Sequence, residues 1–207
     1  MTAGRRVRRG PVGRDAPGAG ARARVLYLPP WRVDVTIRAG VRVPVPVAGL
    51  CRAMAAALAA GRAPQPASIG LVLSDDAELA ALNAFHLGAS GPTDVLSFPL
   101  VAPEAFPGHP GAPRTGTSRS VAGPRPEAFV PPGRRVHLGD VVVSVERAAS
   151  QAAEGRGGQT GDVRWTAADE LHLLVVHGAL HVCGWDHAAP EEEAAMRRLE
   201  RRLIEGA

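Results

Sequence analysis

The sequence contains no lysine, so arginine supplies all 24 of its basic side chains. It has only two cysteines, Cys51 and Cys183, too few for the disulfide framework of a small secreted protein, which favours a reducing cytoplasm. No apolar run approaches the roughly 20 residues that a membrane-spanning helix requires. The Arg-rich N-terminus also lacks the apolar segment of a secretory signal. We therefore expect a cytoplasmic protein without a membrane partner.

The positive charge is concentrated at the N-terminus. The first 24 residues hold seven arginines and one acid, a net charge of +6, and the whole chain carries +4, so the remainder carries −2. Residues 1–28 are rich in Gly, Pro, Ala and Arg without apolar periodicity, and we predict a disordered tail there. Such a tail either holds RNA by neutralising phosphates or stays solvated and inert. The competing source of RNA affinity is arginine in the folded part, such as Arg62, Arg147 or Arg164.

The remaining residues, 29–207, are enough for one well-buried domain. Apolar alternation and short apolar runs predict the strands, and apolar residues three and four apart behind N-cap signals predict the helices. The predicted strands are 31–37, 68–73, 92–99 and 138–143, and the predicted helices are 47–61, 75–85, 145–154, 166–183 and one that begins at Pro190. Prolines at both ends of the third strand favour a sheet edge. The Pro- and Gly-rich residues 101–135 predict a flexible insertion, and residues 155–164 predict a loop.

Three of the seven histidines, His177, His181 and His187, fall within eleven residues at spacing i, i+4 and i+10. Residues four apart share one face of a helix, and Gly184 suits a left-handed cap that turns the chain back toward that face. Three neutral imidazoles with an open position form a catalytic type of zinc site. We therefore predict one Zn²⁺ per chain, on a core helix and the turn that follows it. The alternative is a chance group of histidines or core polar residues, which a helical pair plus a third histidine disfavours.

The same spacing occurs in the metzincin pattern H-E-x-x-H-x-x-G-x-x-H, with Gly178 at the position of the glutamate that acts as general base. Glycine inside a helix costs about 1 kcal/mol relative to alanine, so its presence requires a reason. We expect that it leaves room for a substrate or another backbone beside the ion. The missing base disfavours a peptidase.

Asp186 is the weak candidate for a catalytic role, because it can accept a proton from a metal-bound water or orient a histidine. Orientation is the favoured interpretation. Glu170 lies two helical turns before His177, about 10.5 Å away, so it is no ligand but can bound the cleft or pair with an arginine. His172 lies on another face of the helix and is interpreted as structural. Cys183 is interpreted as a buried structural thiol. Asp94 and Ser97 on the edge strand either line the cleft or stabilise the turn at the end of that strand.

Three segments together resemble the YbeY family of metal-dependent endoribonucleases. They are Pro-Thr-Asp-Val-Leu-Ser-Phe-Pro at 92–99, Leu-Gly-Asp at 138–140 and His-Gly-Ala-Leu-His-Val-Cys-Gly-Trp-Asp-His at 177–187. The third segment is highly specific, and the likeness covers about residues 31–205. It implies a bacterial, cytoplasmic protein with a single α+β domain, in which a small mixed β-sheet is flanked by helices and the three histidines bind zinc.

The resemblance also implies a single-strand-preferring endoribonuclease of ribosomal RNA maturation, acting at the 3′ end of small-subunit RNA and in ribosome quality control. The implied partners are ribosomal RNA in the small subunit and a ribosomal protein or assembly GTPase. The sequence departs from the family at Leu87, where an arginine that contacts RNA is common, and at Trp185, where tyrosine is usual. Leu87 favours a second hypothesis, a ribosome-assembly or binding factor whose zinc is chiefly structural. A metzincin-like peptidase is the third, and Gly178 disfavours it.

Overall fold

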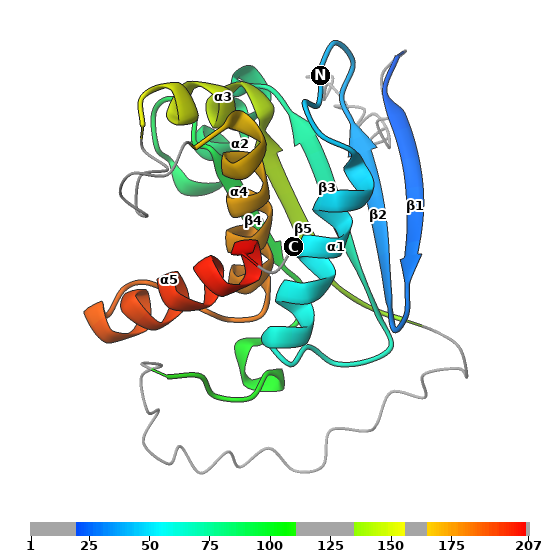
Figure 1. The fold of residues 1–207 in the computed structure, drawn as a ribbon, viewed down its shortest axis with the longest axis vertical. Helices are drawn as coiled ribbons and strands as arrows, with labels where there is room; N and C mark the ends of the chain where they lie inside the picture. Colours follow the sequence, from blue (N-terminus) through cyan, green and yellow to red (C-terminus); the bar gives the residue numbers. More distant parts are fainter. Residues whose placement is uncertain (1–19, 111–134, 156–164, 206–207) are drawn as a thin grey trace, which may run out of the picture.

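A five-stranded mixed sheet runs through the protein in the order β1-β2-β3-β5-β4 (Figure 1). The computed structural model describes residues 20–110, 135–155 and 165–205. The strands are β1 (Arg22–Leu28), β2 (Trp31–Ile37), β3 (Ala67–Ser74), β4 (Val95–Pro99) and β5 (Val136–Ser144). Strands β2, β3 and β5 are parallel to one another, whereas β1 and β4 run antiparallel to their neighbours at the two edges. The prediction of an edge position for the proline-bracketed strand is confirmed by β4.

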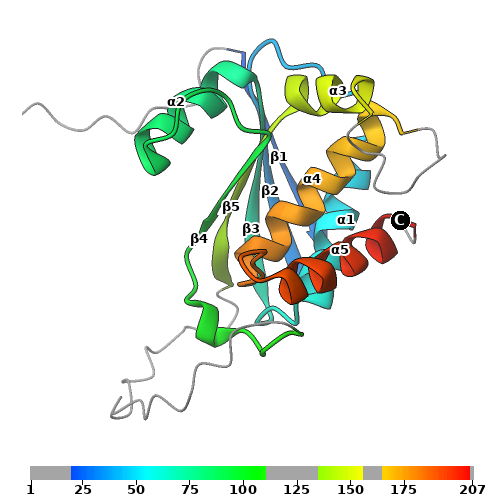
Figure 2. The ribbon, with the colours of Figure 1, turned by 90° about the vertical axis from the view of Figure 1, so that its left-hand side faces the viewer.

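Five helices cover the two faces of this sheet unequally. They are α1 (Val47–Ala60), α2 (Asp76–Leu87), α3 (Val145–Ala153), α4 (Ala167–Val182) and α5 (Pro190–Glu205). Figure 2 shows α2 on one side and the other four on the opposite side. Val141 and Val143 of β5 belong to the large core beneath α1 and α4, while Val142 between them packs with Leu79 of α2. The predicted single α+β domain with a mixed sheet is confirmed.

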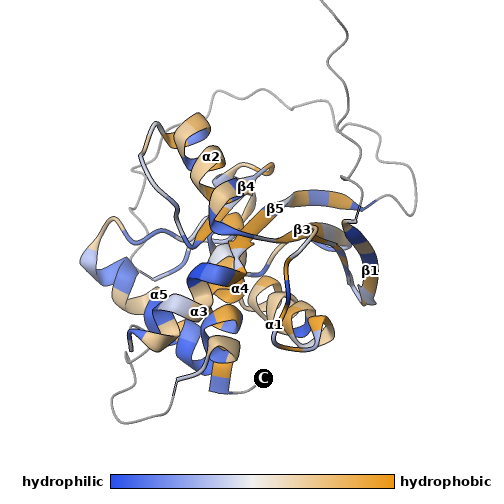
Figure 3. Cartoon of the chain, turned by 90° about the horizontal axis from the view of Figure 1, so that it is seen from above, coloured by the Kyte–Doolittle hydropathy of each residue, from blue (hydrophilic) through white to orange (hydrophobic). Residues whose placement is uncertain are grey.

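Helix α4 is the central helix of the larger layer. It begins with a capping box, in which Thr166 and Asp169 satisfy each other's backbone N–H groups. Nine of its sixteen residues are buried, because the helix lies against β4 and β5 and is flanked by α1, α3 and α5. Figure 3 shows hydrophobic β3 and β5 near this helix and hydrophilic stretches along α5. A helix held on so many sides is a rigid base for functional side chains.

The prediction of disorder over residues 1–28 is wrong for residues 22–28. Those residues form β1, which pairs with β2 across Pro29 and Pro30 so that Leu28 lies opposite Trp31. The strand is largely exposed and therefore has no buried face that would produce an apolar alternation. Backbone hydrogen bonds to β2 form it instead. The predictions for residues 1–19 and 156–164 lie outside the described residues.

The prediction of one flexible insertion over residues 101–135 is wrong at its start. A short 3-10 helix, η1 (Pro103–Ala105), is followed by Phe106, which belongs to the core, and by His109, whose ring stacks on Trp185 at a centroid distance of 4.2 Å. Two aromatic contacts separated by short Pro- and Gly-containing steps leave no periodicity to detect. Residues 111–134 lie outside the described part. Within the described residues no helix is long and apolar enough to cross a bilayer.

Candidate metal centre

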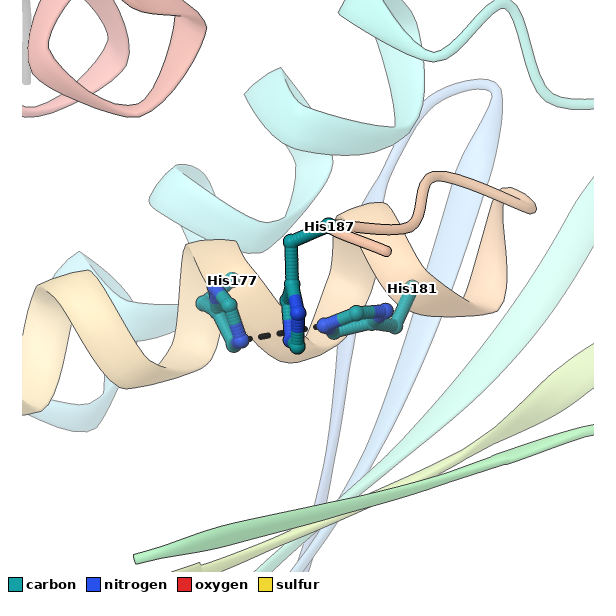
Figure 4. A group of neighbouring side chains, drawn as sticks. All are labelled: His177, His181 and His187. Atoms are coloured by element: carbon teal, nitrogen blue, oxygen red, sulfur yellow. Dashed lines mark hydrogen bonds between the residues drawn. The ribbon is translucent and has the colours of Figure 1, made fainter. Parts of the chain in front are cut away.

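His177, His181 and His187 meet at the C-terminal end of α4 (Figure 4). One ring nitrogen from each lies within 4.8 Å of the other two, and His177 Nε2 and His181 Nε2 are 3.0 Å apart. A tetrahedral ion with Zn–N distances near 2.0–2.1 Å needs nitrogens about 3.3 Å apart. The His177–His181 pair therefore has nearly the spacing that zinc requires, and the third ring lies close enough to join it.

The turn after α4 brings His187 back to the helix. Gly184 has φ +83°, and the N–H of Trp185 donates to the carbonyl of Leu180 at 3.1 Å, which closes a left-handed cap as the sequence predicts. The buried carboxylate of Glu192 then accepts the N–H of Asp186 at 2.9 Å. These bonds hold the turn between the second and third histidine.

Two acceptors orient the imidazoles. His177 Nδ1–H donates to Glu200 Oε1 at 2.7 Å, and His181 Nδ1–H donates to the carbonyl of Trp185 at 2.8 Å. With Nδ1 protonated in this way, the Nε2 lone pair of each ring is free to bind a metal ion between the histidines. Hydrogen bonds of this kind commonly support the histidine ligands of metal sites. The sequence analysis missed both acceptors. Glu200 lies 23 residues from His177 on a different helix, so no local pattern links the two.

His181 is held in its neutral form. Burial, followed by the nearby His177 and His187, lowers the pKa of His181 from 6.5 to about 4. A neutral imidazole is the form that binds a metal, so no proton has to leave this ring at pH 7. A set of three nitrogen donors with an open side fits zinc better than calcium or magnesium, which prefer oxygen. The residues present therefore fit the predicted ion.

The lowered pKa of His181 predicts an acid-labile fold. Below pH 6.5 the unfolded chain binds a proton at this residue that the folded chain does not bind until about pH 4, so stability should fall as the pH drops through that interval. Melting temperatures of the metal-free protein between pH 7 and 4.5 measure the effect. His181→Asn, which removes the titrating ring, should show a smaller fall, and coincident curves would contradict the assignment.

Glu200 is expected to tune metal affinity without touching the ion. Glu200→Ala should weaken zinc binding by about 10- to 100-fold, because an unsupported His177 can rotate and loses basicity. Competition with a coloured chelator measures the affinity. Glu191→Ala, an exposed change on the same helix, is the control and should leave it unaltered.

Asp186 does not orient a ring in this structure, so that favoured interpretation is wrong. Its carboxylate accepts the backbone N–H of His187 at 2.7 Å, while Glu200 and the Trp185 carbonyl hold the rings of His177 and His181. The side chain is exposed beside the triad. Its use as a proton acceptor stays a prediction.

Gly178 faces the sheet. A Cβ at this position would lie 2.5 Å from Val141 Cγ1 and 3.1 Å from Val95 Cγ2, so the glycine lets α4 approach the sheet closely. Ser97 Oγ donates to the Gly178 carbonyl at 3.0 Å and ties β4 to α4 at the same place. Of the two expectations, close approach of another part of the chain agrees with this packing, and room for a substrate does not.

The other candidate residues have distinct surroundings. Glu170 is buried, accepts Trp165 Nε1–H at 2.5 Å and lies in the wall of a cavity of about 280 Å³ that includes His177 and His187. His172 Nδ1–H donates to the Ala168 carbonyl at 2.8 Å, within its own helix. Cys183 is buried, which raises the pKa of its thiol to about 12 and makes it inert.

Asp94 is a half-buried carboxylate that stays ionised. Burial alone would raise its pKa, but hydrogen bonds from Gln151 Nε2, the N–H of Val95 and Thr93 Oγ1 outweigh burial and hold the pKa below the ordinary value. Asp94 lies in the wall of the 280 Å³ cavity and of the larger groove described next. Both sequence interpretations, cleft lining and turn chemistry, therefore apply to it.

The three histidines open onto a groove of about 640 Å³, the metal groove, between α4 and the edge strand β4. Its walls also include His86 and Leu87 at the end of α2, Pro103 and Trp185. Leu87 is 67% exposed, so this end of the groove presents an apolar side chain. A single extended strand of a polymer can reach the triad along such an open groove.

Comparison with known proteins gives one family. The sequence profile of the family described as endoribonuclease YbeY matches residues 48–207. Proteins named endoribonuclease YbeY from Mycolicibacterium vanbaalenii and Salinispora tropica are 39% and 41% identical over 67% and 68% of this chain, and 61% and 74% of their own length is covered. A relative of the same name from Chelativorans sp. is 34% identical over 74% of both chains. The solution structure of TM1509 from Thermotoga maritima is similar with a TM-score of 0.43 at 19% identity, over 77% of this chain and 82% of that chain.

Proposed function

Because this chain belongs to the endoribonuclease YbeY family, we propose that it is a zinc-dependent endoribonuclease that cleaves single-stranded ribosomal RNA in the cytoplasm. The proposed substrate is the 3′ end of small-subunit RNA during ribosome maturation. The proposed partners are the small ribosomal subunit and a ribosomal protein or assembly GTPase. One observation carries the proposal: three imidazoles, two of them with Nε2 oriented by hydrogen bonds at Nδ1, converge beside an open groove.

Each residue of the centre has a role in this proposal. Zinc held by the triad would supply a Lewis acid for the scissile phosphate and lower the pKa of a water molecule. Glu200 and the Trp185 carbonyl keep the ligand nitrogens aimed at one point. Burial keeps His181 neutral. Asp186, exposed beside His187, is the candidate acceptor for the proton that the attacking hydroxyl or water loses.

The proposal is tested with purified, zinc-loaded protein and three substrates: a single-stranded RNA, its duplex and casein. We expect cleavage of the single strand, loss of cleavage on chelation and recovery when zinc is returned. Casein should stay intact. Cleavage that survives chelation would contradict metal dependence, and cleavage of casein would favour the peptidase.

The second candidate function is a ribosome-assembly or binding factor with a structural zinc, and Leu87 favours it. This residue lines the metal groove at the position where the family commonly has an RNA-contacting arginine. Binding of RNA or of the small subunit without strand cleavage, at full zinc occupancy, is the result that would select this function.

Restoring an arginine at this position is expected to strengthen RNA binding. Leu87→Arg places a cation in the wall of the metal groove, so affinity for single-stranded RNA should rise and its salt dependence should steepen by about 0.7 per added phosphate contact. The control is Phe85→Arg, because Phe85 is 82% exposed on the same helix but is not among the groove residues. Equal gains from the two changes would show that position within the groove is irrelevant.

The peptidase is disfavoured by packing as well as by sequence. The helix position that carries a general base in metzincins is Gly178, which faces Val141 and Val95 of the sheet. A glutamate there has no room and no access to the triad.

A further inference from the structure

Three arginines on α5 have no partner among the described residues. Arg198, Arg201 and Arg202, here called the α5 arginine face, are all exposed and take part in no ion pair or hydrogen bond within that part of the chain. Other arginines of the domain are paired with carboxylates: Arg32 with Asp34, Arg38 with Glu78, Arg147 with Asp76 and Arg197 with Glu193. Arg24, Arg42, Arg52 and Arg62 are also exposed without an ion pair among the described residues, but α5 carries three such arginines within five residues. They lie in a part of the chain whose net charge is negative.

Their spacing puts them on a single side of the helix. Residues three and four apart are neighbours on a helix surface, so Arg198 lies next to both Arg201 and Arg202. Like charges at this spacing repel each other, and the C-terminal end of the helix dipole and Glu205 offset only part of that repulsion. An anionic ligand would remove it.

The α5 arginine face borders a groove of about 570 Å³, the α5 groove. The groove has an apolar floor, and Glu205 is its one acid. The apolar lining comes from α5, from the end of α1 and from the segment before residue 111: Ala195, Leu199, Ala60, Trp185 and Pro110. Guanidinium groups bind phosphates through paired N–H bonds, and apolar or aromatic surface receives bases. A rim of arginines over an apolar floor is therefore suited to single-stranded nucleic acid.

The α5 groove lies next to the metal groove. Trp185 lines both, and the segment that contributes Pro103 to the metal groove contributes Pro110 to the α5 groove. His109 of that segment stacks on Trp185 and donates to the Gly184 carbonyl at 3.1 Å, so the junction is fixed. A strand bound at the triad therefore has to extend only past Trp185 to approach the arginines.

We propose that the α5 groove binds the single-stranded RNA that flanks the scissile phosphate, with Arg198, Arg201 and Arg202 contacting consecutive phosphates. This inference rests on the proposed endoribonuclease function. It places RNA affinity in the folded domain as well as in the arginine-rich N-terminus. Arg147, which was named as a folded-part alternative, is paired with Asp76 and contributes less to a free basic surface.

The test is a triple variant, Arg198→Gln, Arg201→Gln and Arg202→Gln, in the full-length zinc-loaded chain. Glutamine has nearly the helix propensity of arginine, so the helix should persist. Affinity for a non-cleavable, 2′-deoxy-substituted 20-nucleotide single strand is measured at several salt concentrations. The slope of log affinity against log salt concentration should be smaller in magnitude by about 2 in the variant, because three phosphate contacts are lost. Between 50 and 200 mM salt the affinity of the wild type should therefore fall roughly 20-fold more than that of the variant. Zinc content and melting temperature verify the fold.

Three controls assign the result. Arg42→Gln changes an exposed arginine elsewhere and should leave the slope unaltered. Cleavage of a trinucleotide, too short to reach α5, should be the same in wild type and triple variant, while cleavage of the long strand should fall. Poly-glutamate is the third probe, and loss of its binding with an unchanged RNA slope would overturn the inference in favour of an acidic protein partner.

Two outcomes separate this inference from the proposed function. Equal RNA slopes for wild type and triple variant, together with normal cleavage of RNA, would overturn the α5 groove and leave the endoribonuclease intact. A reduced slope in a protein that cleaves no RNA would support the α5 groove and overturn the enzyme. A fall in melting temperature with an unchanged slope would show that the arginines serve only the helix end.

Discussion

Replacing His181 by alanine is expected to reduce bound zinc from about one ion per chain to near zero. The same change should lower cleavage of single-stranded RNA by at least about 100-fold, because a Lewis acid contributes several kcal/mol to phosphodiester cleavage. His181 supplies one of only three ligand nitrogens, and its Nε2 lies 3.0 Å from that of His177. The remaining two histidines therefore cannot replace it. Metal analysis of freshly purified, chelator-free protein and a gel assay of RNA cleavage measure the two effects.

The matched control is His172→Ala. His172 lies on the same helix, but its ring bonds to the Ala168 carbonyl and lies against Gly49 of α1, away from the triad. This variant should retain zinc and activity. Wild-type protein that contains almost no zinc would refute the metal site itself. Zinc retained in His181→Ala would show that other residues bind the ion.

Replacing Gly178 by glutamate is expected to destabilise the protein by at least about 3 kcal/mol. This change restores the metzincin sequence pattern, but it directs a carboxylate against Val141 and Val95. A Cβ atom alone at this position would lie 2.5 Å from Val141 Cγ1 and 3.1 Å from Val95 Cγ2. Overpacking and burial of an unpaired charge both oppose folding. Chemical denaturation measures the loss, and no peptidase activity should appear.

Two comparisons make this result specific. Ala194→Glu, an exposed helical change on α5, should stay within about 0.5 kcal/mol of wild type. Gly178→Ala should cost about 1 kcal/mol less when Val141→Ala is also present, because the smaller residue removes the close contact. A stable Gly178→Glu protein, or a cost independent of Val141, would show that α4 can shift away from the sheet.

Much of the domain could be predicted because its signals are local. Apolar residues at helical spacing indicated α1 and α4, and capping residues marked the start of α4 at Thr166. Prolines on both sides of β4 indicated an edge strand. Strand β1 was missed because an exposed edge strand is held by backbone bonds, which leave no pattern in side-chain polarity.

The sequence by itself determined which histidines meet. His177 and His181 are one helical turn apart, and Gly184 permits the left-handed turn that returns His187, so rules acting over eleven residues suffice. Only the tertiary structure decided what surrounds them. Glu200 reaches His177 because α5 packs beside α4, and Gly178 is required because α4 lies against β5. The α5 groove adjoins the metal groove at Trp185, on which His109 of a distant segment stacks. Such contacts depend on the packing of elements distant in sequence, which no local period encodes.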